Sequence, residues 1–252
     1  MSLASLLPAG LDPLIAGLLV ALSLVTSAIT ATFGVGGGSL MIAVIVLVFP
    51  PAVAVPVHGL VQLGSNAGRA VMMRRHVRWN FAVWFIAGAV PGALVGAGVA
   101  TFLPERLVTF AIAAFVIWTA WSPQPRAEVR GPVQTTIAGF AASVLGMVTG
   151  IGGPLVAAML RFLPDRHQII ATQAAIMTAQ NVLKAAAFAT FGFAFASYLP
   201  LVAAMIFSGL IGTAIGGRLM AGLPEAGFRL GFKLTLTAIA LSLLWTALFP
   251  PT

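Results

Sequence analysis

Apolar stretches recur along the whole chain, and they constrain its fold more than any other feature. Ten of them follow one another, at roughly residues 11–33, 38–49, 51–73, 79–101, 104–121, 132–149, 153–163, 165–191, 197–221 and 224–248. A helix of about twenty apolar residues spans the ~30 Å hydrocarbon core of a bilayer. The strands of a membrane β-barrel alternate apolar and polar residues, and these stretches do not. With 60% hydrophobic and 7% charged residues, the sequence predicts an all-α polytopic membrane protein.

Two glycine-rich sequences interrupt the apolar pattern, one in each half of the chain. The first is Gly34-Val35-Gly36-Gly37-Gly38-Ser39 and the second is Gly150-Ile151-Gly152-Gly153-Pro154. Glycine costs a helix interior about 1 kcal/mol relative to alanine, and proline about 3 kcal/mol. Backbone groups freed in hydrocarbon need partners, so such a break lies inside protein or faces a water-filled cavity. A break repeated in both halves is the best sequence pointer to the binding site of a transporter.

The two halves align over most of their length. Matched features, in order, are the two glycine breaks, Asn66-x-x-Arg69 with Asn181-x-x-Lys184, Gly92 and Gly96 with Gly212 and Gly216, and Leu103-Pro104-Glu105 with Leu223-Pro224-Glu225. Four matches in the same order along both halves indicate an internal duplication. We therefore predict a first repeat at residues 1–121, a linker rich in proline and charge at 122–131, and a second repeat at 132–252.

Charge predicts that the second repeat is upside down relative to the first. Counting crossings places ten of the thirteen Lys and Arg residues on one side of the membrane and only Arg106 on the other. The positive-inside rule makes the basic side the cytoplasm. We therefore expect a cytoplasmic linker and both termini on the periplasmic or extracellular side.

The segments after the breaks, 38–49 and 153–163, are too short to cross. Twelve helical residues rise only ~18 Å. We predict two inverted-topology repeats, each with a Gly-broken helix and half-helix pair plus three transmembrane helices. Two tilted full crossings joined by a tight surface turn are the alternative reading.

Half-helix N-termini that meet near the midplane form a ready anion site. Each offers unpaired N–H groups and about half a positive charge, and bare glycines allow close approach. Ser39 and Thr149 can add hydroxyl donors. The alternative role for glycine is close helix packing, which we predict for Gly92, Gly96, Gly212 and Gly216.

Segments 51–73 and 165–191 carry a polar stripe that faces the bundle interior because polar groups are costly in lipid. The predicted substrate-binding residues are Gly34, Gly36, Gly37, Gly38, Ser39, His58, Gln62, Asn66, Arg69, Gly150, Gly152, Gly153, Gln173, Asn181 and Lys184. Arg69 and Lys184 would stand near opposite mouths of the site. The stripe can instead serve interhelical hydrogen bonds, with Arg69 snorkelling to headgroups.

These residues resemble the sulfite exporter TauE/SafE family of bacterial membrane transporters. The resemblance rests on the duplicated glycine motif and the repeated polar helix, and it covers about residues 11–248. It implies transport of sulfite, sulfoacetate or a related organosulfonate. Pro154 stands where the first motif has Gly38, so the two half-sites are not equivalent.

We expect a secondary transporter that works by alternating access, with a passive anion channel of similar selectivity as the alternative. The chain has no cysteine, and no span pairs a nucleophile with a base, so we expect no enzyme activity and no cofactor. We also expect no nucleic-acid partner, because the cations orient the protein in the lipid bilayer. The sequence leaves open a coupling ion, H+ (through His58) or Na+, and a homo-oligomer.

Overall fold

The computed structural model describes residues 7–8, 10–33, 36–122, 131–219 and 225–249, and the regular secondary structure in these ranges is helical. The helices are α1 (Pro13–Phe33), α2 (Gly37–Val48), α3 (Pro51–Met72), η2 (Arg74–His76), α4 (Trp79–Phe102), α5 (Glu105–Trp121), α6 (Pro132–Thr149), α7 (Gly153–Met159), α8 (Arg166–Thr190), η3 (Phe195–Tyr198), α9 (Leu199–Leu219) and α10 (Glu225–Leu248). Nine of the ten predicted segments agree with these bounds to within two residues. The predicted all-helical fold is confirmed.

The exception is α7, which ends at Met159 rather than at 163. Residues after it form turns in which the N–H of Leu163 donates to the carbonyl of Leu160 at 3.0 Å. Pro164 disfavours helix at Leu163, which matches the expected bound, but the turns at residues 160–163 end α7 one turn earlier. The chain then reverses, and Asp165 caps the start of α8.

Five helices in the described ranges are long and apolar enough to cross a membrane. These spans are Pro13–Phe33, Trp79–Phe102, Pro132–Thr149, Phe195–Gly216 and Leu230–Leu248. The helices α3 and α8 have 22 and 25 residues, so they are also long enough to cross, but their polar side chains are buried in the protein. The chain is a multi-pass membrane protein.

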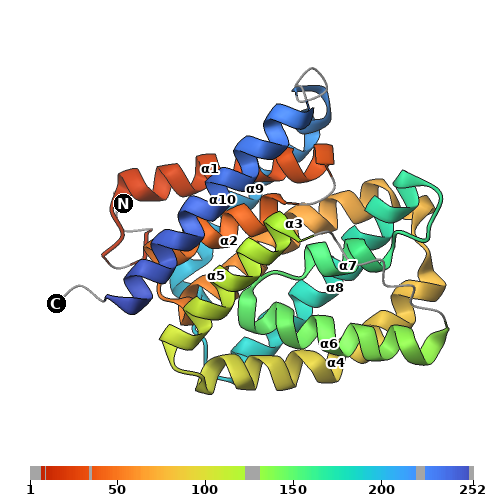
Figure 1. Ribbon diagram of the computed structural model, residues 1–252, viewed down its shortest axis with the longest axis horizontal. Helices are drawn as coiled ribbons and strands as arrows, with labels where there is room; N and C mark the ends of the chain where they lie inside the picture. Colours follow the sequence, from red (N-terminus) through yellow and green to blue (C-terminus); the bar gives the residue numbers. More distant parts are fainter. Residues whose placement is uncertain (1–6, 9, 34–35, 123–130, 220–224, 250–252) are drawn as a thin grey trace.

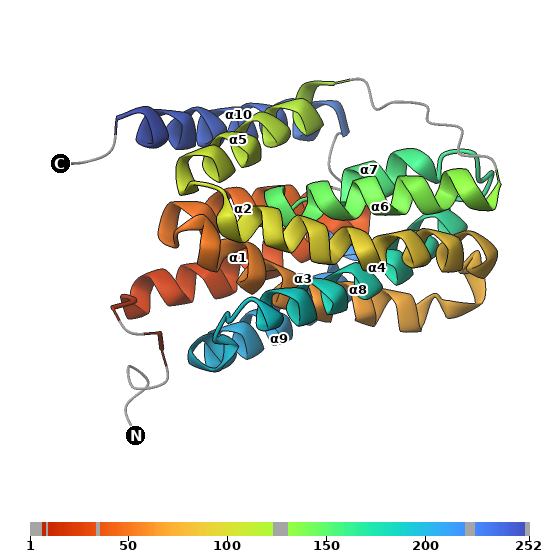
Figure 2. The same cartoon turned by 90° about the horizontal axis from the view of Figure 1, so that it is seen from below.

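Most close helix contacts join the first half of the chain to the second. The helix α1 packs along α9, α4 along α6, α3 along α8, and α5 along α10. Figure 1 shows α1 and α3 running from left to right, whereas α6 and α8 run from right to left. Figure 2 shows α5 and α10 side by side along one edge of the molecule.

Serine hydroxyls tie α1 to α9. The Ser23 hydroxyl donates to the carbonyl of Met205 at 2.6 Å, and the Ser208 hydroxyl donates to the carbonyl of Val20 at 2.8 Å. Both serines are buried. Hydrogen bonds of this kind add to the van der Waals packing that drives helix association in membranes.

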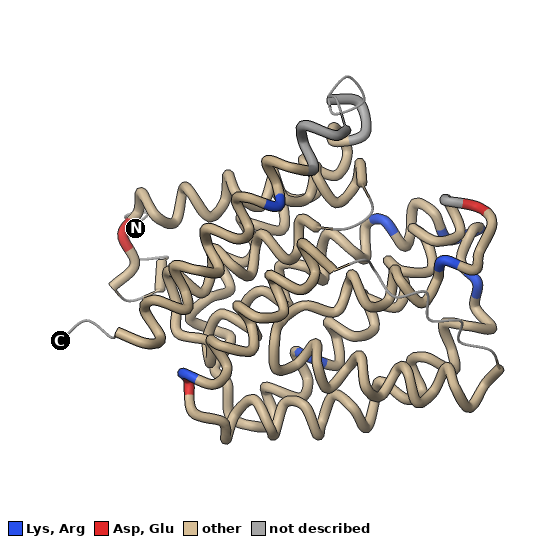
Figure 3. Tube along the Cα trace, viewed as in Figure 1, with Lys and Arg blue, Asp and Glu red and all other residues tan. Residues whose placement is uncertain are grey.

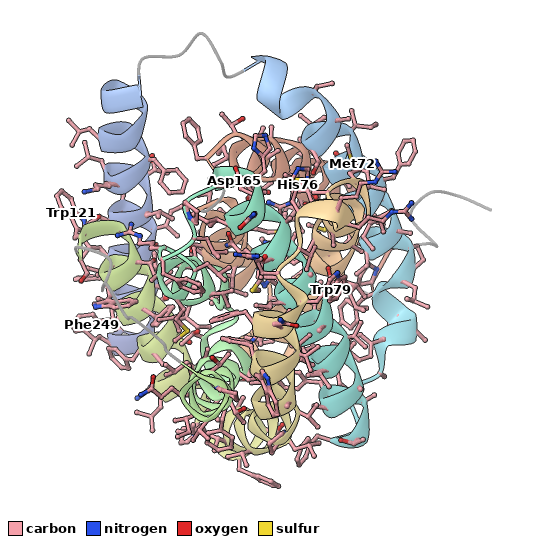
Figure 4. The ribbon with its side chains drawn as sticks, turned by 90° about the vertical axis from the view of Figure 1, so that its right-hand side faces the viewer. Met72, His76, Trp79, Trp121, Asp165 and Phe249 are labelled. Atoms are coloured by element: carbon pink, nitrogen blue, oxygen red, sulfur yellow. The ribbon has the colours of Figure 1, made fainter. Side chains whose placement is uncertain are left out.

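Charged residues gather toward one end of the molecule. Figure 3 shows Lys and Arg on the α3–α4 connection toward the right-hand end, whereas the start of α5 carries one basic and one acidic position at the left. Figure 4 looks onto the right-hand end, where His76 and Asp165 lie near each other. The rings of His76 and His167 are 5.6 Å apart, and His167 Nδ1 lies 3.2 Å from Asp165 Oδ1. The backbone N–H of His167, which donates to Asp165, lowers the pKa of that exposed carboxyl.

Glycines let α4 and α9 approach the backbones of their partners. The predicted packing residues are Gly92, Gly96, Gly212 and Gly216. A Cβ at Gly92 would meet the carbonyl oxygen of Phe140 at 2.5 Å, and one at Gly212 would overlap the carbonyl oxygen of Leu24. The same close approach recurs one turn later in both pairs. The predicted packing role of these glycines is therefore confirmed.

Replacing Gly212 by alanine tests this packing. Gly212→Ala places a methyl group against the α1 backbone, and overpacking of this kind costs about 1–3 kcal/mol. We expect a lower Tm for the protein in detergent. Gly17→Ala is the control, because a Cβ there meets nothing within 4 Å and alanine favours the helix. Equal melting temperatures for the two variants would contradict the packing role.

Candidate functional site

A cavity of about 40 Å³ lies where the two glycine breaks meet. The ends of α1 and α6, the starts of α2 and α7, and the middles of α3 and α8 enclose it. Its lining residues are Thr30, Gly36, Gly38, Ser39, His58, Gln62, Asn66, Arg69, Gly150, Ile151, Gly152, Gly153, Pro154, Gln173, Met177 and Asn181. Twelve of the fifteen predicted site residues are among them, and they come from both halves.

Backbone conformations at the breaks need glycine. Gly36 has φ +105° and Gly150 has φ +76°, and L side chains rarely adopt such values. The helix α6 ends in a left-handed cap at Gly150, the usual position for a glycine after a helix. The predicted site residue Gly34 lies outside the described residues.

The two half-helices make unequal contributions to the cavity. The helix α2 has twelve residues, and the first N–H groups of a helix have no intrahelical partner. The helix α7 has only seven residues, and Pro154 in its first turn lacks an N–H. The main helix N-terminus facing the cavity is therefore that of α2.

Polar side chains of α3 and α8 form the rest of the wall. His58 Nε2 lies 3.1 Å from the Gly38 carbonyl oxygen, and Gln173 Nε2 donates to the Gly153 carbonyl, also at 3.1 Å. The Asn66 amide donates to the carbonyl of Gln62 at 2.9 Å. These bonds orient the stripe toward the breaks, where the sequence pattern placed it.

Three buried polar atoms in the wall have no hydrogen-bond partner among the described residues. They are Ser39 Oγ, His58 Nδ1 and Asn181 Nδ2, and each of these side chains is at most 3% exposed. A buried polar group without a partner costs about 1–3 kcal/mol. Ser39 and Asn181 offer donors, and His58 Nδ1 is an acceptor in the neutral ring or a donor in the charged ring. These atoms are therefore available to hydrogen-bond a polar group in the cavity.

Arg69 brings a positive charge to the cavity wall. Its Nη2 donates to Asn66 Oδ1 at 2.7 Å, and its Nη1 donates to the Thr30 carbonyl at 3.3 Å. The side chain is 7% exposed, so the guanidinium lies inside the protein and not at the lipid headgroups. No Asp or Glu stands among the lining residues.

Two predicted site residues do not line the cavity. A Cβ at Gly37 would overlap the Thr26 carbonyl oxygen, so Gly37 packs α2 against α1. Lys184 is 4% exposed and its Nζ donates to the Gly150 carbonyl at 3.4 Å. The ammonium group is therefore deep in the protein beside the second break, whereas the sequence placed it near a mouth of the site.

Sequence reasoning did not select Thr30 or Met177 as lining residues. Met177 stands four residues from both Gln173 and Asn181, so helical spacing could have found it. Thr30 lies in the last turn of α1, one turn before the break. It lines the site because the turn at Gly36 folds α2 back against α1.

Comparison with known proteins identifies the family of this chain. A model of the family described as "Sulfite exporter TauE/SafE" matches residues 19–243. The chain belongs to the sulfite exporter TauE/SafE family. This TauE/SafE chain is also 34% identical over 84 residues to the "Probable membrane transporter protein YunE" of Bacillus subtilis (strain 168). That match covers 32% of this chain and 31% of the relative, so it spans about a third of the length of either protein. No solved structure matches.

The break geometry of this TauE/SafE chain can be tested at Gly36. Gly36→Ala forces a side chain into a strained backbone region, at a cost of about 1–3 kcal/mol, and its Cβ would also meet the Phe232 ring at 3.0 Å. We expect a lower Tm for this variant. Gly153→Ala should leave Tm nearly unchanged, because the nearest atom to its Cβ is Gln173 Nε2 at 3.5 Å. Equal losses at both glycines would refute the assignment of strain to Gly36.

Proposed function

We propose that this TauE/SafE family member is a secondary transporter for a small sulfur-containing anion. Sulfite, sulfoacetate and related organosulfonates are the candidates. The buried donors of Ser39 and Asn181, which have no partner among the described residues and lie beside the cavity, carry the proposal. The occupant would lie between the two glycine breaks.

Charge favours an anion over a cation. The guanidinium of Arg69 and the N-terminus of α2 both present positive charge to the cavity. A charged group inside a membrane protein needs a compensating partner, and the lining residues include no carboxylate. A bound anion would supply that partner.

The size of the cavity favours a small oxyanion. A volume of about 40 Å³ holds roughly three water molecules, because each needs ~10–15 Å³ of such space. Sulfite suits this space better than sulfoacetate does. A larger substrate would need the cavity to widen.

Buried apolar residues pack beside the cavity. Val156 in α7 and Leu160 just after it are fully buried. They pack with Phe85 of α4 and Ile176 of α8 in one apolar cluster. Ile42 of α2 is also fully buried and lies next to the second break, where a Cβ at Gly150 would meet Ile42 Cγ1 at 2.9 Å. This apolar packing around a small cavity supports a carrier over a permanently open anion channel.

Alternating access would use the internal duplication. The contact of α1 with α9 has its counterpart in the contact of α4 with α6, and equivalent helices run in opposite directions (Figure 1). These features support inverted repeats at residues 1–121 and 132–252, joined by 122–131. The basic end of the molecule (Figure 3) would face the cytoplasm, and both termini would then lie on the periplasmic side of a bacterial inner membrane.

Anion binding is the first test. We expect sulfite to raise Tm of the purified protein in detergent, since a ligand that binds only the folded state stabilises it. Sulfate, thiosulfate, sulfoacetate, taurine and acetate complete the panel. Ser39→Ala removes one hydrogen bond to a charged ligand, which is worth about 1.5–3 kcal/mol. The anion should therefore bind roughly 10- to 150-fold more weakly.

Ser143→Ala is the matched control. Ser143 on α6 is also buried, with a hydroxyl that lacks a partner among the described residues, but it does not line the cavity. The control should bind the anion like the unchanged protein. No Tm shift with any anion, or equal weakening by both substitutions, would refute the proposed site.

Transport in liposomes distinguishes a carrier from a channel. A carrier accumulates labelled sulfite against its gradient when a proton or sodium gradient is imposed, and its rate saturates with substrate. A passive channel only equilibrates the label. Equilibration without accumulation under either gradient would favour the channel.

A further inference from the structure

Two pairs of side chains on α3 and α8 repeat the same spacing. Arg69 follows His58 by eleven residues, and Lys184 follows Gln173 by eleven. Eleven residues are about three helical turns, or ~16.5 Å, so each pair lies on one face of its helix. All four side chains are buried, at 7% exposure or less.

The α3 pair holds the first break on both sides. Arg69 Nη1 donates to the Thr30 carbonyl in the last turn of α1. His58 Nε2 lies 3.1 Å from the Gly38 carbonyl oxygen in the first turn of α2. The last carbonyls of a helix lack intrahelical partners and carry partial negative charge, so a cation there satisfies and neutralises them.

The α8 pair holds the second break in the same way. Lys184 Nζ donates to the carbonyl of Gly150, the C-cap of α6. Gln173 Nε2 donates to the carbonyl of Gly153, the first residue of α7. The Lys184 stem crosses α3 at Gly59, where a Cβ would meet Lys184 Cγ at 3.2 Å. Glycine at this position leaves room for the stem.

We propose that α3 and α8 act as two clamps, each fixing the glycine break of its own half. Arg69 and His58 are the positioning residues of the first clamp, and Lys184 and Gln173 are those of the second. Carbonyl groups on both sides of each break are then held by the protein, and the cavity keeps its shape. The functional consequence, a preformed anion site, rests on the proposed function.

The clamp assigns different roles to the two aligned cations. Arg69 lines the cavity as well as holding α1, whereas Lys184 does not line the cavity and donates to the backbone at Gly150. Arginine in one half and lysine in the other fill the first position, and histidine and glutamine fill the second. The clamp therefore needs a hydrogen-bond donor at each position rather than one particular residue type. Each half thus supplies the conservative replacement for the other.

A cysteine reporter tests the second clamp without any anion. The chain has no cysteine, so Ile151→Cys places one thiol in the cavity wall, at a position that is 2% exposed. The rate of its reaction with a small water-soluble thiol reagent would be measured in the Lys184→Met and Lys184→Arg backgrounds. We expect the thiol to react at least tenfold faster in the Lys184→Met background than in the Ile151→Cys protein. In the Lys184→Arg background we expect a rate within twofold of that protein.

Ser143→Cys in the same backgrounds is the control for loss of fold, and its labelling should not change. If Lys184→Met does not fold, the comparison of Gln173→Leu with Gln173→His uses the same reporter, with faster labelling expected only for leucine. Equal labelling rates in Lys184→Met and Lys184→Arg, or in Gln173→Leu and Gln173→His, would overturn the clamp.

The anion-binding panel separates this proposal from the proposed function. Donor-dependent labelling without any anion-induced Tm shift would support the clamp and refute the anion site. Anion binding together with donor-independent labelling would leave the anion site standing and overturn the clamp.

Discussion

Backbone groups inside a membrane protein need partners within the protein, and the two glycine breaks raise this need in the middle of the structure. Side chains of α3 and α8 take up carbonyl groups on both sides of the breaks. The N–H groups at the start of α2 face the cavity instead. Carbonyls are thus satisfied by the protein, while donors remain available to an occupant. This division supports the proposed preference of the cavity for negative charge.

The two halves differ in what they bring to this centre. The helix α2 has twelve residues, α7 has seven, and Pro154 removes a donor from the second break. Arg69 reaches the cavity, whereas Lys184 stops at the backbone behind it. The first half therefore supplies most of the charge, and the second half adds the amide of Asn181. A substrate would therefore meet a site whose two sides differ.

Most of the helices could be predicted because apolar length, glycine and proline mark their ends directly in the sequence. The end of α7 could not, since it depends on the turn that Leu160 and Leu163 make before α8. The polar stripe was predictable from helical spacing. The depth of Lys184 was not, because it depends on the gap at Gly59 of another helix. Thr30 was missed for a related reason: only the folded path at Gly36 brings it to the cavity.

The pairing of α1 with α9 has a consequence for the making of the protein. The helix α6 follows α4 closely in the chain, but synthesis of α1 starts at Pro13, 186 residues before that of α9 at Leu199. At roughly 5–20 residues per second, this delay lasts on the order of ten seconds. Meanwhile Ser23 has no Met205 carbonyl to bind, and the surface that will receive the α9 glycines faces lipid or the insertion machinery. Assembly of the first half therefore finishes only when the second half is almost complete.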